Sequence, residues 1–283
     1  MNRKLRYRTF VTKQIPQSGR GPLPDGKTRM WSPITSTLIL GRHDAVLIDP
    51  PLTTTQAAEV GDWIAASGRQ LRQVYITHGH GDHWFGAIPL LQRFPGVAVQ
   101  ATSGTAKLME AQNDPGFRAE FWDRVFPGQL PGGELDVSIV DEHGFEFDGV
   151  ALIPVEVGHT DTDATTMLHV PDMGLLVAGD VVYNGVHLYL TESGGVAGID
   201  EWLAALDTAE RLRAATVIAG HKDPRAFDNP SQIQATRRYL TDARRLLESS
   251  ETAEEFYREM LRLHPGRINP GALWGAAITL LPS

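Results

Sequence analysis

The stretch VYITHGHGDHWFG, at residues 74–86, contains four side chains of the kinds that bind metal ions. They are His78, His80, Asp82 and His83, and they follow directly after the apolar run of a predicted strand. Imidazole nitrogens and carboxylate oxygens are common ligands of zinc and iron. Two residues apart on extended backbone, His78 and His80 point to the same side and can bind one cation. The glycine that follows allows a tight turn, which can direct the next two ligands to a second metal ion.

A solvated loop that holds these histidines by accident is the alternative interpretation. The chain has only 10 histidines in 283 residues, so this density of metal-binding side chains is improbable by chance. We therefore treat the loop as one part of a metal centre and look for the other part further along the chain.

Three later segments repeat one pattern, in which an apolar run and a glycine precede a potential ligand. The segments are VEVGHT, LLVAGD and TVIAGH, and the ligands are His159, Asp180 and His221. Taken singly, each could be a buried polar side chain with a hydrogen-bond partner. Residues at the ends of strands lie on a rigid scaffold and can converge above one edge of a sheet. Together with the histidine-rich loop, they predict one metal centre.

The segments that must position these residues alternate between strands and helices. Apolar runs and helical spacing predict strands at 36–40, 45–49, 73–77 and 97–101, a helix at 54–67, and helical segments near residue 84 and up to about 125. A strand-rich passage up to residue 180 precedes a helix at 200–214, a strand at 216–220, and helices at 230–263 and 270–281. This order predicts an α/β fold with two β-rich halves and helices outside, a layered sandwich.

We expect three parts along the chain. Residues 1–34 are expected to be an irregular arm, because residues 16–33 are rich in proline, glycine and charge without a period. Residues 35–225 would carry the metal centre, and residues 226–283 would form a helical extension packed on the same domain.

The composition excludes several classes of protein. Without cysteine, the chain has no thiolate nucleophile and no sulfur ligand, so any metal must be bound by His, Asp or Glu. A net charge of −8 disfavours nucleic acid as a partner. The basic N-terminal segment lacks the apolar core of a secretory signal, and no apolar stretch is long enough to cross a membrane. We therefore expect a cytoplasmic protein that acts on a small molecule, with no membrane partner, and we leave open a homodimer.

From Thr35 to Lys222 the chain resembles the metallo-β-lactamase-fold superfamily. THGHGDH is similar to its His-x-His-x-Asp-His motif, and GHT, AGD and AGH are similar to its later motifs, in the same order. The resemblance implies an αββα four-layer sandwich, here with extra C-terminal helices, and a dinuclear site. It implies two divalent metal ions, with zinc expected and iron or manganese as alternatives. The implied ligands are His78, His80 and His159 for one metal, Asp82, His83 and His221 for the other, and Asp180 as the bridge.

The resemblance also implies a reaction. A hydroxide bridging the two metals would attack the carbonyl carbon of an ester, lactone or thioester, and Asp82 or Asp180 would pass a proton to the leaving group. True β-lactam hydrolases of the superfamily place a cysteine at the position of Asp180 or arrange the histidines differently, so a β-lactamase is disfavoured. The chain looks more like the lactonase and glyoxalase II-like branch.

Several further residues are candidates for supporting roles. Tyr183 stands at the offset from the bridging aspartate at which acyl-homoserine lactonases carry a tyrosine, and its phenol could donate to the carbonyl oxygen. Asp49, at the end of a predicted strand, matches an acidic position behind the site and would orient a ligand histidine. His187 could touch the substrate, and Trp84 and Phe85 could line an acyl pocket or pack in the core.

Two other enzyme classes keep the same ligands. A small phosphodiesterase could use a dinuclear site to stabilise a pentacoordinate phosphorus. A mononuclear iron sulfur dioxygenase, which is an oxidoreductase, shares the fold, and these ligands do not separate iron from zinc. A binding module without activity would require the loss of ligands, and the predicted set is complete.

Overall fold

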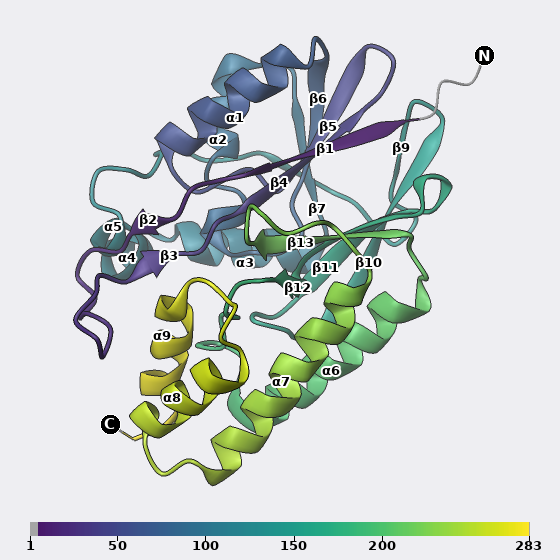
Figure 1. The fold of residues 1–283 in the computed structure, drawn as a ribbon. Helices are drawn as coiled ribbons and strands as arrows, with labels where there is room; N and C mark the ends of the chain where they lie inside the picture. Colours follow the sequence, from purple (N-terminus) through teal and green to yellow (C-terminus); the bar gives the residue numbers. More distant parts are fainter. Residues whose placement is uncertain (1–4, 283) are drawn as a thin grey trace.

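The computed structural model describes residues 5–282 as a sandwich of two β-sheets with helices on both outer faces (Figure 1). Helices α1 (Thr54–Ala66) and α2 (Ala87–Arg93) cover the outer face of the first sheet, and α6 (Gly195–Arg211) and α7 (Ser231–Ser249) cover that of the second. These four layers confirm the predicted αββα architecture and its C-terminal helices.

The first sheet has six strands in the order β1-β4-β5-β6-β7-β8. Their bounds are Arg6–Val11, Thr35–Leu40, Asp44–Ile48, Gln70–Tyr75, Ala98–Ala101 and Val137–Ile139. The hairpin of β4 and β5 is antiparallel, whereas β5, β6, β7 and β8 run parallel. The loop after β6 therefore leaves the sheet at its carboxyl edge, where open α/β folds place their sites.

The second sheet has five strands in the order β13-β12-β11-β10-β9. Their bounds are Thr216–Lys222, Leu175–Asn184, Thr165–Val170, Val150–Gly158 and Phe145–Phe147. Only β12 and β13 run parallel, so the polar residues that end these two strands emerge side by side. A small separate sheet pairs β2 (Ile15–Pro16) with β3 (Met30–Trp31).

The remaining helical segments lie in the connections and at the C-terminus. Their bounds are η1 Gly81–His83, α3 Ser103–Asn113, α4 Pro115–Phe117, η2 Arg118–Trp122, α5 Asp123–Val125, η3 Pro171–Met173, α8 Ala253–Leu263 and α9 Pro270–Leu280. Residues 230–263, which we predicted to be helical throughout, form two helices instead of one. The break lies at Ser250, whose backbone is extended, and Thr252 caps the second helix by accepting a hydrogen bond from Glu255 N.

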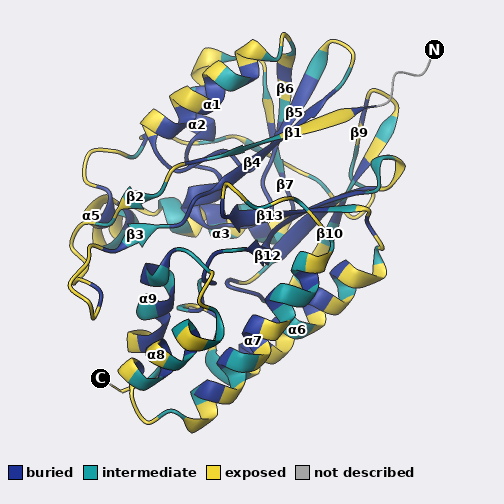
Figure 2. Ribbon diagram, viewed as in Figure 1, coloured by how far each residue is buried: buried dark blue, intermediate teal, exposed yellow. Residues whose placement is uncertain are grey.

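Three apolar clusters hold the layers together. Between the sheets, Ile48 and Tyr75 of the first sheet pack in one cluster with Leu168 and Val177 of the second. The other two clusters lie between each sheet and its helices. Burial is continuous along the central strands β4 and β12, whereas half of the edge strand β1 is exposed. In the outer helices the buried residues follow one stripe, as Figure 2 shows. Fully burying a leucine- or valine-sized side chain stabilises a fold by roughly 1.5–3 kcal/mol, so the clusters make the strand ends a rigid base for the site.

The N-terminal arm differs from the prediction. Residues 1–4 lie outside the described residues, as does residue 283 of the C-terminal extension. Part of the rest is regular, because β1 pairs with β4 from Arg6↔Leu40 to Val11↔Thr35, whereas residues 17–29 contain no helix or strand. An edge strand with charged residues on its exposed face lacks the apolar run by which we recognised the other strands.

Two aromatic residues beside the histidine-rich loop belong to the core. Trp84 and Phe85 are buried in the cluster beneath the first layer of helices and do not line the pocket described below. The Trp84 indole nitrogen donates to Gly79 O at 2.9 Å and so holds the loop from behind. Of their two expected roles, the structure supports packing. No helix among residues 5–282 is both long and apolar enough to cross a membrane.

Candidate metal centre

The loop after β6 brings its four candidate ligands into the interior. His78, His80, Asp82 and His83 are all buried, and each has a ligand atom close to that of a residue from the second sheet or its loops. The short helix η1 closes the turn, since His83 N donates to His80 O at 3.0 Å. The sequence pattern therefore predicted both the location and the convergence of these side chains.

The second sheet supplies two more candidate ligands from adjacent parallel strands. Asp180 lies within β12 and His221 within β13, and both are buried. A side chain at position 220 would collide with the Asp180 carboxylate. The glycine of TVIAGH is therefore required, because the carboxylate crosses the backbone of β13 at this point.

His83, Asp180 and His221 form the tightest part of the cluster. His83 Nε2 lies 3.3 Å from both His221 Nε2 and Asp180 Oδ1. His221 Nε2 lies 3.1 Å from Asp180 Oδ2 and 3.5 Å from Asp82 Oδ2. Nitrogen and carboxylate oxygen atoms facing one another at this spacing fit a shared divalent cation.

The described residues contain three overlapping groups whose ligand atoms lie within 4.8 Å of one another. The groups are Asp82, His83 and His221; His78, His83 and Asp180; and His78, His80 and Asp161. Within residues 5–282, His78 Nε2, Asp161 Oδ2 and Asp180 Oδ1 are buried and form no hydrogen bond of regular geometry. The two carboxylate oxygens face imidazole nitrogens at 3.2 Å (His80 Nδ1) and 3.3 Å (His83 Nε2). Buried polar atoms without partners are costly, so their convergence fits a site built for cations.

His159 is the one predicted ligand that the structure does not bring to the cluster. Its Nδ1 lies 2.6 Å from Asp163 Oδ1, and its Nε2 lies 3.0 Å from Ser193 O. Asp161 occupies the predicted place instead, with its Oδ2 at 3.2 Å from His80 Nδ1. The physical reason is local: β10 has an irregular register at its end, and Gly158 adopts a left-handed φ of 79°. This turn directs His159 outward and Asp161 inward, which corrects our assignment.

The outer nitrogens of the ligand histidines have partners behind the site. His221 Nδ1 lies 2.8 Å from Pro33 O, and His83 Nδ1 lies 3.3 Å from Asp49 Oδ2. Asp49 also accepts hydrogen bonds from Thr77 N and Thr77 Oγ1, at 2.9 and 2.8 Å. Such contacts orient imidazole rings so that Nε2 faces the centre. The expected position of Asp49 behind the site is thus the observed one.

Charges inside the cluster shift its pKa values strongly. Burial, together with the charge of His83, lowers the pKa of His78 to about 3. Burial opposes charging of His83 as well, but Asp180 and Asp82 raise the pKa of this imidazole to about 10. Burial would raise the pKa of Asp180, yet His221 and His83 hold it well below its usual range. The cluster therefore retains protons that a metal ion would displace.

Tyr183 lies in contact with the cluster. Its hydroxyl donates to Asp180 Oδ2 at 2.6 Å, and its ring stacks on that of His221 with a centroid distance of 5.4 Å. Burial and the neighbouring Asp180 raise the pKa of Tyr183 well above its usual value, so the phenol keeps its proton. A neutral phenol at this place can donate a hydrogen bond to a carboxylate or to a substrate oxygen.

Sequence analysis missed three residues that contact the cluster. The first is Trp31, whose Nε1 donates to Asp82 Oδ2 at 2.8 Å. The second is Glu192, whose Oε2 lies 3.3 Å from His80 Nε2 and whose Oε1 accepts a hydrogen bond from the Tyr189 hydroxyl. Asp161 is the third. The acidic residues of GHTDTD were the only sequence signal for Asp161, and the two others come from segments that only folding brings to the site.

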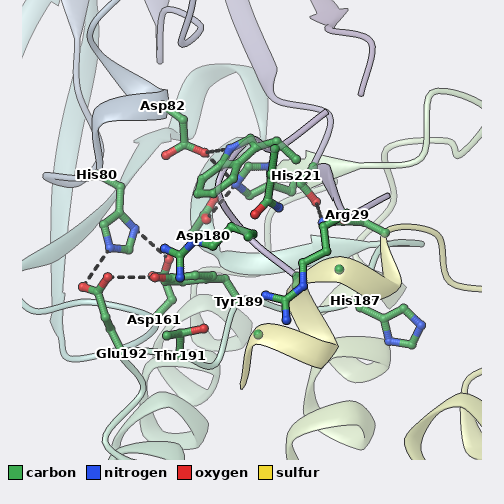
Figure 3. A pocket seen from close by; sticks show the side chains of 18 of the residues that line it. Arg29, His80, Asp82, Asp161, Asp180, His187, Tyr189, Thr191, Glu192 and His221 are labelled. Atoms are coloured by element: carbon green, nitrogen blue, oxygen red, sulfur yellow. Dashed lines mark hydrogen bonds and ion pairs between the residues drawn. The ribbon is translucent and has the colours of Figure 1, made fainter. Parts of the chain in front are cut away.

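A pocket opens onto one side of the cluster (Figure 3). Its walls come from distant parts of the chain: the β2–β3 segment, helical segment η2, the loop at 187–192, and the face of α9. Residues from the cluster that reach the pocket are His80, Asp82, Asp161, Asp180, Tyr183 and His221. A substrate in this pocket would therefore meet the cluster and these walls together.

His187 lines the pocket but is directed away from the cluster (Figure 3). Its Nδ1 lies 3.0 Å from Tyr239 Oη, and burial, with the charge of Arg267, lowers its pKa to about 3 from 6.5. In the unfolded chain the imidazole takes up a proton below about pH 6.5, whereas the folded protein resists it. The free energy of unfolding should therefore fall as pH decreases from 6.5 toward 3.

A His187→Asn variant tests this linkage. Asparagine keeps a polar group toward Tyr239 and cannot titrate. When the pH is lowered from 6.5 to 5.5, the free energy of unfolding should therefore fall by about 1 kcal/mol less in the variant than in the wild type. Urea unfolding at both pH values measures the difference. Parallel pH profiles for the two proteins would contradict the burial of a neutral His187.

Comparisons with known proteins agree with this geometry. Residues 29–221 match the model of the metallo-beta-lactamase superfamily. A metallo-beta-lactamase family protein from Thermus thermophilus is similar over 96% of this chain and 91% of its own, with a TM-score of 0.65 and 18% identity. A metallo-beta-lactamase from Pontibacter korlensis is similar over 83% and 99%, with a TM-score of 0.57 and 21% identity.

A third similar structure is the FIM-1 metallo-beta-lactamase from Pseudomonas aeruginosa in its mono-zinc form. It is similar over 85% of this chain and 92% of its own, with a TM-score of 0.56 and 15% identity. No curated protein sequence matches the chain. At these identities, structural similarity shows the fold alone, whereas the family model spans most of the chain, including the histidine-rich loop, Asp180 and His221. The chain therefore belongs to the metallo-beta-lactamase superfamily, whose members are mostly metal-dependent hydrolases, and it carries a His/Asp cluster suited to divalent metal ions.

Proposed function

We propose that the protein hydrolyses an ester, lactone or thioester with two divalent metal ions, for which zinc is the expected element. One observation carries this proposal: the Asp180 carboxylate belongs to one group with His78 and His83 and also lies 3.1 Å from His221. A carboxylate shared in this way can join two metal positions. One metal would be held by His78, His80 and Asp161, and the other by Asp82, His83 and His221, with Asp180 between them.

When bound, two such cations supply an activated water and a Lewis acid for a carbonyl oxygen. Residues of the chain would supply the proton transfer and the hydrogen bond to the developing negative charge. Asp82 is held by the Trp31 indole and faces the pocket, so its carboxylate can carry a proton toward the leaving group. The Tyr183 hydroxyl, which the structure places on Asp180, can donate to the oxygen on which negative charge develops.

Two features support the lactonase and glyoxalase II-like branch over β-lactam hydrolysis. The chain has aspartate where the resemblance places cysteine in true β-lactam hydrolases, and it contains no cysteine at all. The Tyr183 phenol also lies at the cluster, as it would in a lactonase-like site. The similar structures named as metallo-beta-lactamases support the fold but, at 15–21% identity, carry no substrate to this chain.

Metal analysis combined with a substrate panel tests the proposal. Protein purified without added metal is analysed for zinc, iron and manganese, and its turnover of a γ-lactone, an aryl ester, a thioester, a phosphodiester and a β-lactam is measured. About two zinc ions per chain and turnover of the acyl substrates are expected. A single iron per chain with oxygen uptake on a persulfide would move the protein to the oxidoreductases, and turnover of the phosphodiester alone would make it a phosphodiesterase.

A Tyr183→Phe variant should keep its metal and lose part of its rate. Removing one charge-assisted hydrogen bond at the developing charge should lower kcat about 10- to 100-fold and change KM little. The ring still packs against Trp202 and His221, so the fold is retained. Steady-state kinetics with metal analysis of the same sample measure the effect. An unchanged kcat would show that Tyr183 only packs.

A further inference from the structure

Arg29 is a buried cation without an ionic partner. The residue is 5% exposed. Within residues 5–282 its Nε has no hydrogen-bond partner, and its guanidinium forms no ion pair. Arginine does not lose its proton in proteins, and an unpaired buried charge is costly. A ligand that supplies an anion would remove this cost.

The backbone holds Arg29 at the wall of the pocket. It directly precedes β3, and Gln17 N donates to Arg29 O at 2.9 Å, so the β2–β3 ladder fixes its position. Two residues later, Trp31 bonds to Asp82 of the cluster. The Arg29 side chain extends beside α9, on the other side of the pocket from His80 and Glu192 (Figure 3).

Helix α9 leaves room in front of Arg29. The residues of α9 that line the pocket near its start are small, namely Gly271, Ala272 and Gly275. A Cβ at position 271 would lie 3.1 Å from Met30 O, so the helix begins against the backbone next to Arg29. The positive end of a helix dipole and a guanidinium therefore lie at the same wall, and both favour an anion.

The charges around Arg29 add to this preference. Burial and the charge of Arg20 lower the pKa of Arg29, while Tyr257 acts in the opposite direction. Arg20 is exposed and lines the same pocket. Glu192, the acidic residue of the opposite wall, is already bound to His80 and Tyr189. Among residues 5–282 no carboxylate forms an ion pair with Arg29, so an anionic group of the substrate can supply its partner.

We propose that Arg29 binds a carboxylate of the substrate, so that the enzyme prefers esters, lactones or thioesters that carry a free acid group. This inference rests on the proposed function for the scissile bond, but the anion site is an independent observation. The planar guanidinium matches the two oxygens of a carboxylate in a bidentate pair. Arg29 is the buried cation of this wall, whereas Arg20 is exposed and its charge is screened by solvent, so the buried part of the site suits a monoanion better than a phosphate.

Matched substrate pairs test the preference. Acetylthiopropionate and propyl thioacetate share the scissile thioester and differ in the carboxylate, and the γ-lactone of hydroxyglutarate and γ-valerolactone form a lactone pair. The measured quantity is the ratio of kcat/KM for the acid to kcat/KM for its neutral partner, in the metal-loaded wild type and in Arg29→Met, Arg29→Lys and Arg20→Met.

We expect the wild type to prefer the acids and Arg29→Met to lower the ratio about 10- to 100-fold. Arg29→Lys should retain an intermediate ratio, and it replaces Arg29→Met if that variant does not fold. Arg20→Met should change the ratio only a few-fold, because exposed charges are screened. No preference in the wild type, an unchanged ratio in both Arg29 variants, or an equal loss in Arg20→Met would overturn the proposal.

Calorimetric titration with succinate separates this inference from the proposed function. If none of the esters, lactones or thioesters is hydrolysed, the proposed function fails, and the titration alone decides the role of Arg29. Succinate should bind the wild type about 10- to 100-fold more tightly than Arg29→Met. Equal succinate affinity in the two proteins, or a loss of inorganic phosphate affinity in Arg29→Met as large as the loss of succinate affinity, would overturn the carboxylate assignment.

Discussion

An Asp180→Ala variant is expected to lose kcat/KM by at least about a thousandfold and to retain less metal than the wild type. The Asp180 carboxylate faces both His83 and His221, at 3.3 and 3.1 Å, and would be the ligand shared by the two metals. Its removal withdraws a negative charge from both positions, and each lost tenfold in rate corresponds to about 1.4 kcal/mol of transition-state stabilisation. Kinetics on the best substrate of the panel, with metal analysis, measure both effects.

Asp172→Ala is the matched control for this variant. Asp172 is an exposed aspartate of η3, just before the strand that carries Asp180, and it forms no ion pair within residues 5–282. The control should behave as the wild type. Full activity and full metal content in Asp180→Ala would contradict a shared carboxylate at the centre of the site.

The second large effect is expected from two variants in a single loop, Asp161→Ala and His159→Ala, whose positions are two residues apart. Asp161 is buried beside His80, whereas His159 contacts Asp163 and Ser193. Asp161→Ala should lose about one metal ion per chain and most of its activity, because only His78, His80 and the shared Asp180 would remain to bind that ion. His159→Ala should keep both.

Metal analysis of the two purified variants, by mass spectrometry of the released ions, decides between the ligands without relying on turnover. The opposite result, with metal lost in His159→Ala and retained in Asp161→Ala, would restore the histidine of the GHT motif as the ligand. It would also show that this loop changes conformation when metal binds.

The GHT loop shows where prediction from sequence stops. Residues 159 and 161 are two apart, so on extended backbone both would face the same side, and the motif resemblance favoured the histidine. The left-handed Gly158 and the irregular end of β10 decide which side chain turns inward. A glycine adopts either sign of φ with similar ease, so the sequence alone does not determine this turn.

Of the residues that contact the candidate ligands from outside the cluster, some could be predicted from the sequence and others could not. Asp49 was predictable because it ends a strand beside the histidine-rich loop, and local order along a strand follows from the pattern of apolar residues. Trp31 and Glu192 were not predictable, since each lies far along the chain from the ligand that it contacts, Trp31 in a strand of two residues and Glu192 in an irregular segment.

By itself, the sequence determined the superfamily, the layered α/β fold, and most of the cluster, from His78 to His83 with Asp180 and His221. These residues lie directly after β6 or within β12 and β13, where hydrophobic burial determines the strand and the strand determines the direction of the neighbouring side chains. Only the tertiary structure decided that Asp161 faces the cluster and that Arg29 lies in the same pocket. Those placements depend on loop conformation and on contacts between the N-terminal segment, the two sheets and α9, which no local pattern of residues encodes.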